Sequence, residues 1–167
     1  MLEFALTLNG PCAIRYPRGE APDFGSVYRG DYGAIEKNKS IFDGEELVIF
    51  AVGKMVSIAY EVCLDLREKG VDIGLINARS IHPLDEESIV STAKKAKKIM
   101  TLEDNVITGG FGQQVIALLV NKDINIPCRN IGWPDCFVEH GNDEELFIKY
   151  KLDAKGIAER VRDFIER

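Results

Sequence analysis

Two arginines near the N-terminus stand in a run that could bind an anion. Arg15-Tyr16-Pro17-Arg18-Gly19 follows a short apolar stretch, and the pattern predicts a strand over 12–16. Pro17 fixes its own φ and pushes the residue before it toward an extended conformation. Arg18 then projects from the strand end, where its forked guanidinium suits a phosphate or carboxylate. Arg18 is therefore the first candidate for binding a substrate phosphate and Arg15 a weaker one, with a solvated surface arginine as the alternative.

A glycine-rich turn, Gly109-Gly110-Phe111-Gly112, stands at the expected start of a helix. Backbone amides and the helix dipole could bind a phosphate there. The spacing departs from G-x-G-x-x-G, because Val115 stands where a third glycine would be, so close packing of helix on strand is the favoured interpretation. Glu103-Asp104 ends the preceding strand. Adjacent strand residues point to opposite faces, so hydrogen bonding to the turn is favoured over an acid–base pair.

Histidine and cysteine do not form a metal-binding or redox pattern. His82 and His140 lie far apart in the sequence, and neither stands at ligand spacing from a cysteine. No C-x-x-C pair occurs, so reduced thiols are expected of the four cysteines, Cys12, Cys63, Cys128 and Cys136. The sequence therefore predicts no metal site and a cytoplasmic protein.

Composition narrows the class of partner. The chain has 167 residues with a net charge of −6, which makes wholesale binding to nucleic acid or an anionic membrane unexpected. No apolar run approaches the ~20 residues that span a bilayer. The N-terminus has no basic leader and no cleavage-site pattern, which again favours the cytoplasm.

The elements that must position these residues alternate along the chain. Continuous apolar runs predict strands, and 3.6-residue apolar periodicity predicts helices between them. The expected strands are 46–52, 71–77, 97–103 and 126–131. The expected helices are 2–8, 55–69, 86–96 capped by Asp85, 108–121, one capped by Asn142 and one capped by Asp153. The segments that connect successive strands are a dozen or more residues long, which implies parallel strands joined by helices. Such helices cover both faces of the sheet, so the expected fold is a three-layer α/β/α domain.

Four runs carry a resemblance to a known family, namely 10–19, 78–85, 102–112 and 130–141. In them the chain resembles the synthases of 1-deoxy-D-xylulose 5-phosphate, thiamine-diphosphate enzymes of the transketolase superfamily. The R-Y-P-R-G run and the G-W-P-D…E-H-G run are the specific ones, whereas the P-L-D and G-G-x-G matches are shared more loosely with E1 β-like subunits. Trp133 and Cys136 stand where the family more often has Leu and Phe.

The resemblance implies a domain organisation. Residues 1–19 would be the tail of a pyrimidine-binding domain, 20–31 a linker, and 32–167 a transketolase C-terminal domain. That domain would hold a five-stranded, mostly parallel sheet with one antiparallel edge strand, expected at Ala34–Lys37. This implication replaces the all-parallel sheet that the alternation alone favours.

The resemblance also implies an activity for a longer protein. The full enzyme would be a homodimer that condenses pyruvate with glyceraldehyde 3-phosphate and releases carbon dioxide, on the route to isoprenoid precursors, thiamine and pyridoxal. It would use thiamine diphosphate and Mg²⁺ held by upstream domains, with Arg18 binding the acceptor's phosphate. This chain alone would be inactive and serve assembly. The alternatives are a stand-alone module that binds a small anion near Gly53 and Gly109, or part of an E1 β-like subunit.

Overall fold

A mixed sheet of five strands forms the centre of the molecule. The structure, a computed structural model, describes residues 2–14, 16 and 37–167. The strands lie in the order β1-β3-β2-β4-β5, with β1 antiparallel to β3 and every other pair parallel. Their bounds are Lys39–Phe42 (β1), Leu47–Ala51 (β2), Ile73–Asn77 (β3), Ile99–Val106 (β4) and Cys128–Trp133 (β5). The expected sheet, mostly parallel with one antiparallel edge strand, is confirmed.

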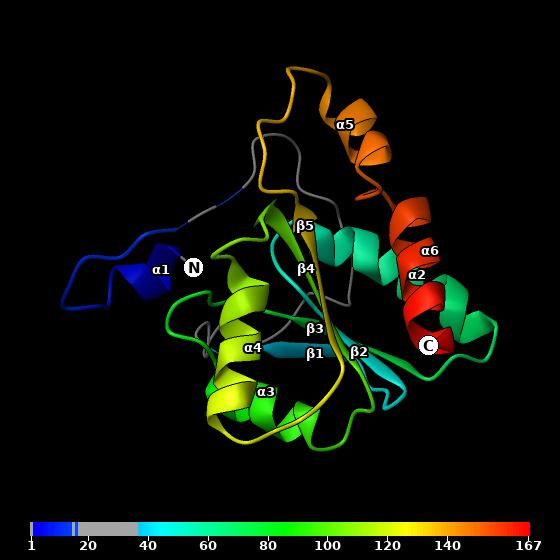
Figure 1. Cartoon of the computed structure of the whole chain (residues 1–167). Coiled ribbons are helices and arrows are strands. Elements are labelled where there is room, and N and C mark those ends of the chain that lie inside the picture. Colours follow the sequence, from blue (N-terminus) through cyan, green and yellow to red (C-terminus); the bar gives the residue numbers. More distant parts are fainter. Residues whose placement is uncertain (1, 15, 17–36) are drawn as a thin grey trace.

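Helices cover both faces of the sheet, which confirms the three layers (Figure 1). α2 and α6 pack on one face, and α3 and α4 pack on the other. α5 lies beyond the ends of β4 and β5, and α1 stands to one side of the sheet. The helices are Leu2–Ala5 (α1), Met55–Glu68 (α2), Glu86–Ala93 (α3), Phe111–Asn121 (α4), Asp143–Lys149 (α5) and Ala154–Glu166 (α6).

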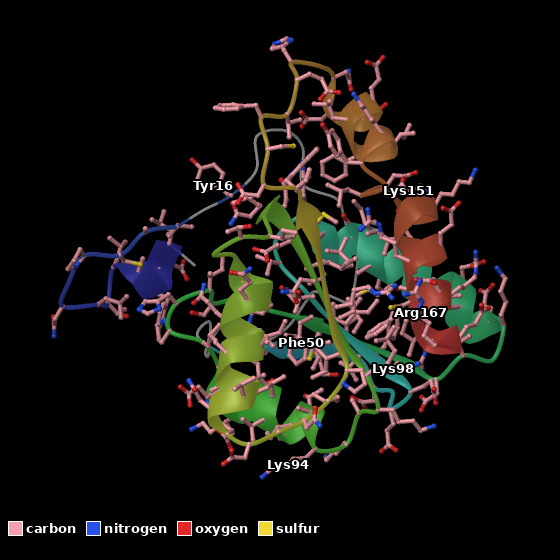
Figure 2. The ribbon with its side chains drawn as sticks, viewed as in Figure 1. Tyr16, Phe50, Lys94, Lys98, Lys151 and Arg167 are labelled. Atoms are coloured by element: carbon pink, nitrogen blue, oxygen red, sulfur yellow. The ribbon has the colours of Figure 1, made fainter. Side chains whose placement is uncertain are left out.

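The central strand β2 shows why the strands are continuous apolar runs. All five of its residues are buried. Successive side chains of a strand point to opposite faces, so Leu47 and Ile49 join the core under α2 and α6. Val48 and Phe50 join the core under α3 and α4. Figure 2 labels Phe50 in the middle of the molecule, where no part of its side chain reaches solvent.

Polar side chains begin three of the helices, as their sequence positions predict. The Asp85 carboxylate accepts a hydrogen bond from the Ser88 amide at the start of α3. Asn142 and Asp153 do the same at the starts of α5 and α6. Each cap satisfies an amide that has no partner within its helix, which fixes where the helix starts.

The edge strand forms a few residues later than predicted. The expectation of Ala34–Lys37 is wrong for Lys37, which is a bend, and residues 34–36 lie outside the described residues. The Lys37 ammonium instead bonds to carboxylates at the start of α3. Phe42, in the strand that does form, stacks on the ring of Tyr60 with centroids 5.2 Å apart. The edge strand β1 therefore forms where its apolar residues, such as Phe42, can be partly buried against the core.

The prediction of a strand over 12–16 is wrong for the residues of that range that are described. Residues 12–14 and 16 are not in a strand, and Arg15 is outside the described part of the chain. A strand is stable only when a neighbour accepts its hydrogen bonds, and none of the described strands pairs with residues 12–14. The predicted N-terminal helix also stops early, at Ala5. Among the described residues, no helix has the length and apolar content needed to cross a membrane.

Candidate functional site at the carboxyl edge of the sheet

The carboxyl ends of the parallel strands β2, β4 and β5 bring together three side chains that are far apart in the sequence. In open α/β sheets this edge is the usual place for a ligand. The Lys54 ammonium, after β2, lies 3.1 Å from a carboxylate oxygen of Asp104 in β4. The indole N–H of Trp133, at the end of β5, donates to the other oxygen of Asp104 at 2.7 Å. The sequence analysis pointed to neither Lys54 nor Trp133 as a partner of Asp104, because the three are far apart along the chain.

Aromatic side chains then cover this edge. Phe147 of α5 and Tyr150 meet the Trp133 ring edge-on, each with centroids 5.4 Å apart. The Lys54 ammonium lies 4.1 Å from the centroid of Phe147, a cation–π contact. We call Lys54, Asp104, Trp133, Phe147 and Tyr150 the carboxyl-edge cluster. These contacts link the turn after β2, the ends of β4 and β5, and α5 at the carboxyl edge.

The carboxylate of Glu103 in β4 binds the backbone amides at the start of α4. Its side chain is only 2% exposed. One carboxylate oxygen accepts from the amide of Phe111 at 2.8 Å, and the other accepts from the amide of Gly112 at 2.9 Å. The protein's own carboxylate therefore takes the place that an external anion would take at a helix N-terminus. The expectation that Glu103 bonds to the turn that follows it is confirmed.

The glycines of the turn allow that approach. A Cβ on Gly110 would lie 2.5 Å from the Glu103 carboxylate. A Cβ on Gly112 would overlap the Thr101 hydroxyl and lie 2.5 Å from Asn130. Those two strand residues are joined by a hydrogen bond of 3.0 Å. Close packing of α4 on β4 and β5 is thus the reason for the small residues, as the sequence favoured.

At the turn that contains Gly53, the first amides of α2 are likewise hydrogen-bonded within the protein. Gly53 has a φ of +57°, which turns the chain from β2 into the helix. The amides of Met55, Val56 and Ser57 donate back to the carbonyls of residues 52, 53 and 54. At both turns considered for a small anion, Gly53 and Gly109, the amides at the start of the following helix are therefore already hydrogen-bonded to other groups of the protein. That geometry speaks against the alternative of a stand-alone anion-binding module.

The described residues among the remaining sequence candidates do not join the carboxyl-edge cluster. Arg15 and Arg18 lie outside the described residues. His82 and His140 are exposed, and the described part of the chain holds no group of three His, Cys, Asp or Glu side chains that could bind a metal ion. Burial raises the pKa of the Cys63 thiol to about 12, so this cysteine is unreactive.

A loop ending at His140 is fastened to the end of α5. The Glu139 carboxylate forms an ion pair with Lys149 and accepts from the Tyr150 hydroxyl at 2.8 Å. The Lys149 hydrogen bond, a backbone hydrogen bond and the Tyr150 hydroxyl together lower the pKa of Glu139 to about 2. Because Tyr150 also packs on Trp133, this fastening connects the loop to the carboxyl-edge cluster.

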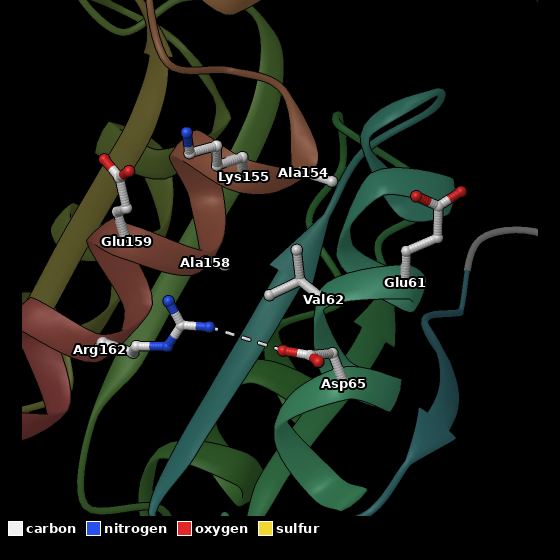
Figure 3. A pocket seen from close by; sticks show the side chains of 8 residues that line it. All are labelled: Glu61, Val62, Asp65, Ala154, Lys155, Ala158, Glu159 and Arg162. Carbon is white, nitrogen blue, oxygen red and sulfur yellow. Dashed lines mark ion pairs between the residues drawn. The ribbon is translucent and has the colours of Figure 1, made fainter. Parts of the chain in front are cut away.

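Two hollows occur elsewhere on the described surface. A groove of about 290 Å³ runs between α2 and α6, and Figure 3 shows the ion pair of Arg162 with Asp65 across it, at 3.6 Å. A cleft of about 350 Å³ lies between β1 and α3, with Ser40, Ser88 and Thr92 in its wall. Neither hollow includes a residue of the carboxyl-edge cluster.

Comparison with known families accounts for this architecture. The family model of the transketolase C-terminal domain matches residues 37–157. The chain belongs to this family. The expected resemblance is confirmed, and the match includes every strand and helix from β1 to α5.

Curated relatives are similar over nearly the whole chain. The 1-deoxy-D-xylulose-5-phosphate synthase of Caldanaerobacter subterraneus is 38% identical over 161 residues, covering 96% of this chain and 26% of the relative. The enzyme of the same name from Dehalococcoides mccartyi strain BAV1 is 40% identical over 169 residues, covering 99% of this chain and 26% of the relative. The chain thus spans about a quarter of the length of these relatives.

Solved structures agree on the fold. A split-gene transketolase described as an inactive β4 tetramer has a TM-score of 0.77 and 25% identity, covering 89% of this chain and 48% of that one. A transketolase mutant from Pichia stipitis has a TM-score of 0.59 at 19% identity, covering 80% of this chain and 18% of that one, which shows the fold alone.

The described residues of this transketolase C-terminal domain do not fit thiamine diphosphate or Mg²⁺. The amides at the start of α4 are bonded to Glu103. The carboxyl edge is filled by the cluster around Trp133. The described segments also hold no group of three metal ligands.

Proposed function

We propose that this chain is the C-terminal part of a 1-deoxy-D-xylulose-5-phosphate synthase, which condenses pyruvate with glyceraldehyde 3-phosphate and releases carbon dioxide. The observation that carries the proposal is similarity over 99% of the chain to enzymes of that name. This similarity extends before residue 37, where the domain match begins. It therefore includes residues beyond the shared domain, which favours a synthase over an E1 β-like subunit.

The role of this chain is assembly and not chemistry. The transferase activity of the longer protein uses Mg²⁺ and thiamine diphosphate, and the thiamine diphosphate supplies the reactive carbanion when bound. Upstream parts of that cytoplasmic homodimer hold both, and this chain stabilises the assembly and contributes to dimerisation. The filled carboxyl edge of this domain supports that division, and so does the similar split-gene chain, whose tetramer is described as inactive.

Recombination of the two parts tests the proposal. The upstream three-quarters of a full-length synthase of this type is expressed separately, mixed with this chain, and assayed for pyruvate-dependent formation of 1-deoxy-D-xylulose 5-phosphate. We expect neither part to be active alone and the mixture to form a complex with activity. A mixture that neither forms a complex on size-exclusion chromatography nor gains activity would contradict the proposal.

Arg18 is proposed to bind the phosphate of the aldehyde acceptor. A bidentate guanidinium–phosphate contact contributes about 1.5–3 kcal/mol, so Arg18→Ala in the full-length enzyme should raise the KM for glyceraldehyde 3-phosphate about 10- to 100-fold. The KM for pyruvate should stay unchanged, and Arg15→Ala serves as the weaker comparison. Unchanged kinetics with the aldehyde phosphate would remove Arg18 from the site.

A further inference from the structure

The cleft between β1 and α3 lies beside a polar face of the helix. Ser88, Ser91 and Thr92 stand three and four residues apart, so they share one face of α3, and all three line the cleft. The apolar side chains of the helix, Ile89 and Ala93, pack into the core instead. Short hydroxyl side chains do not fill the space between α3 and β1. A cleft of about 350 Å³ therefore stays open, which is in the size range of small-molecule sites.

Hydrogen bonds hold the two walls of the cleft together at both of its ends. At one end the Asp85 carboxylate accepts from the amide of Asn38 at 2.8 Å and from the amide of Ser88 at 3.3 Å. At the other end the amide of Lys97 donates to the carbonyl of Glu45 at 2.7 Å. The folded chain therefore fixes the width of the cleft before any ligand binds, and a preformed site loses little entropy on binding.

A bulge in β1 keeps the aromatic side chain of this strand out of the cleft. The pairing of β1 with β3 shifts between Ser40 and Phe42. The Phe42 ring stacks on Tyr60 of α2, on the opposite face of the sheet. Val48 and Ile76, which belong to the core under α3 and α4, line the cleft from the sheet. The cleft therefore has an apolar floor and polar walls.

One polar atom in the wall of the cleft is buried without a partner. The side-chain nitrogen of Asn38, which lines the cleft, forms no hydrogen bond within the described part of the chain. Such a donor destabilises the fold until an acceptor meets it. The hydroxyls of Ser88 and Thr92 also donate to no group among the described residues. These groups indicate a ligand that carries several oxygen atoms.

The charges around the cleft favour a neutral ligand over an ion. Lys95 follows α3, Asp43 and Glu45 follow β1, and all three line the cleft. Among the described residues the Lys95 ammonium forms no ion pair. The ammonium disfavours a cation, and the two carboxylates disfavour an anion. A neutral hydroxyl group suits both kinds of group, because it accepts from an ammonium or an amide and donates to a carboxylate.

We propose that this cleft binds a small neutral polyhydroxy compound, namely a free sugar or polyol. Its hydroxyl groups accept from the Asn38 amide and the Lys95 ammonium and donate to the carboxylates beyond β1, over the apolar floor. A neutral ligand of this size exchanges its hydrogen bonds with those of water, so a dissociation constant of about 1–10 mM is expected. The site is separate from the carboxyl-edge cluster, and the inference does not depend on the proposed synthase activity.

Amide chemical shifts of the ¹⁵N-labelled 167-residue chain test the inference, during titration to about 100 mM with glycerol, D-xylose, D-glucose or myo-inositol. We expect at least one of the four to shift the amides of residues 38–40 and 88–95 in a saturable way. At about pH 6, D-glucuronate and D-glucosamine, which carry a negative and a positive charge, should bind more weakly than that compound. No saturable shift at these residues with any of the four, or tighter binding of either charged sugar, would overturn the proposal.

Variants of the helix wall test whether binding takes place in the cleft. Thr92→Val keeps the shape of the side chain and removes one hydroxyl, so it should weaken binding about fivefold. Ser88→Leu places a larger apolar side chain in the cleft and should abolish binding. Thr108→Val is the matched control, because Thr108 is exposed in the glycine turn and does not line the cleft. Circular dichroism establishes that each variant is folded. Wild-type affinity in both Thr92→Val and Ser88→Leu would place the ligand elsewhere and overturn the inference.

Replacement of Asn38 separates binding from stability. Asn38→Leu keeps the approximate size of the side chain and removes the unpaired nitrogen, so it should weaken binding at least about fivefold without lowering the urea midpoint. A residue with a purely structural role would show the reverse pattern. Unchanged binding together with a lowered midpoint would therefore contradict the assignment of Asn38 to a ligand.

Discussion

Replacing Glu103 by Gln removes the charge beneath α4 and keeps the shape of the side chain. Both carboxylate oxygens of Glu103 accept amide hydrogen bonds, at 2.8 and 2.9 Å. A carboxamide has one acceptor oxygen, so its NH₂ group would face an amide that can only donate. One charge-assisted bond is lost at about 1.5–3 kcal/mol, and the other becomes a neutral bond that is weaker by about 1 kcal/mol.

The expected loss of unfolding free energy is therefore about 2.5–4 kcal/mol. Urea denaturation at 25 °C, followed by circular dichroism, should show the midpoint lowered by about 1 to 2 M with an unchanged slope. Glu144→Gln is the matched control, because Glu144 is exposed on α5 and should change stability by less than about 0.5 kcal/mol. If Glu103→Gln changes stability no more than this control, the buried carboxylate does not stabilise the start of α4.

Three further predictions concern Gly112, Glu139 and Cys63. Gly112→Ala should destabilise the domain by about 2 kcal/mol or more in urea unfolding, because its Cβ would overlap the Thr101 hydroxyl, whereas Gly10→Ala, with open space around it, should have no effect. Because its bonds, first to Lys149, lower the pKa of Glu139 to about 2 from an ordinary 4.5, the stability they contribute is present above pH 4.5 and should be lost as the pH falls toward 2; an NMR titration that finds a pKa near 4.5 would contradict this. Because burial raises the pKa of Cys63 to about 12, this thiol should react with a disulfide reagent at pH 8 only when urea unfolds the chain; since Cys12 and Cys136 are exposed, the labelled cysteine is identified by peptide mapping, and fast labelling of Cys63 itself in the folded protein would contradict the burial.

Local sequence signals predicted most of the elements correctly. Continuous apolar runs marked β2, β3, β4 and β5, and Asp85, Asn142 and Asp153 marked the starts of three helices. These signals work because the side-chain period of a strand or helix and the geometry of a cap depend on neighbouring residues alone. The prediction over 12–16 is wrong at the described residues 12–14 and 16 for the opposite reason, since a strand also needs a partner that its own residues do not specify.

The candidate site was less predictable than the fold. The hydrogen-bonding role of Glu103 was foreseen because its strand leads directly into the glycine turn. The partners of Asp104 were not, since Trp133 lies 29 positions along the chain from it. A lysine in the turn after one strand and an aspartate near the end of another are a signal for such a pair, but only once the two strands are known to be neighbours.

The sequence by itself determined the alternation of strands and helices and the three-layer class. It also determined membership of a transketolase family, because the four runs that resemble the family occur in the family's order along the chain. The tertiary structure alone decided that β2 lies between β3 and β4, so that Lys54, Asp104 and Trp133 meet and α5 covers them. It also decided that Glu103 takes the amides at the start of α4. The physical reason is that the order of strands minimises the exposed apolar area of the whole domain, a quantity to which residues from every part of the chain contribute at once.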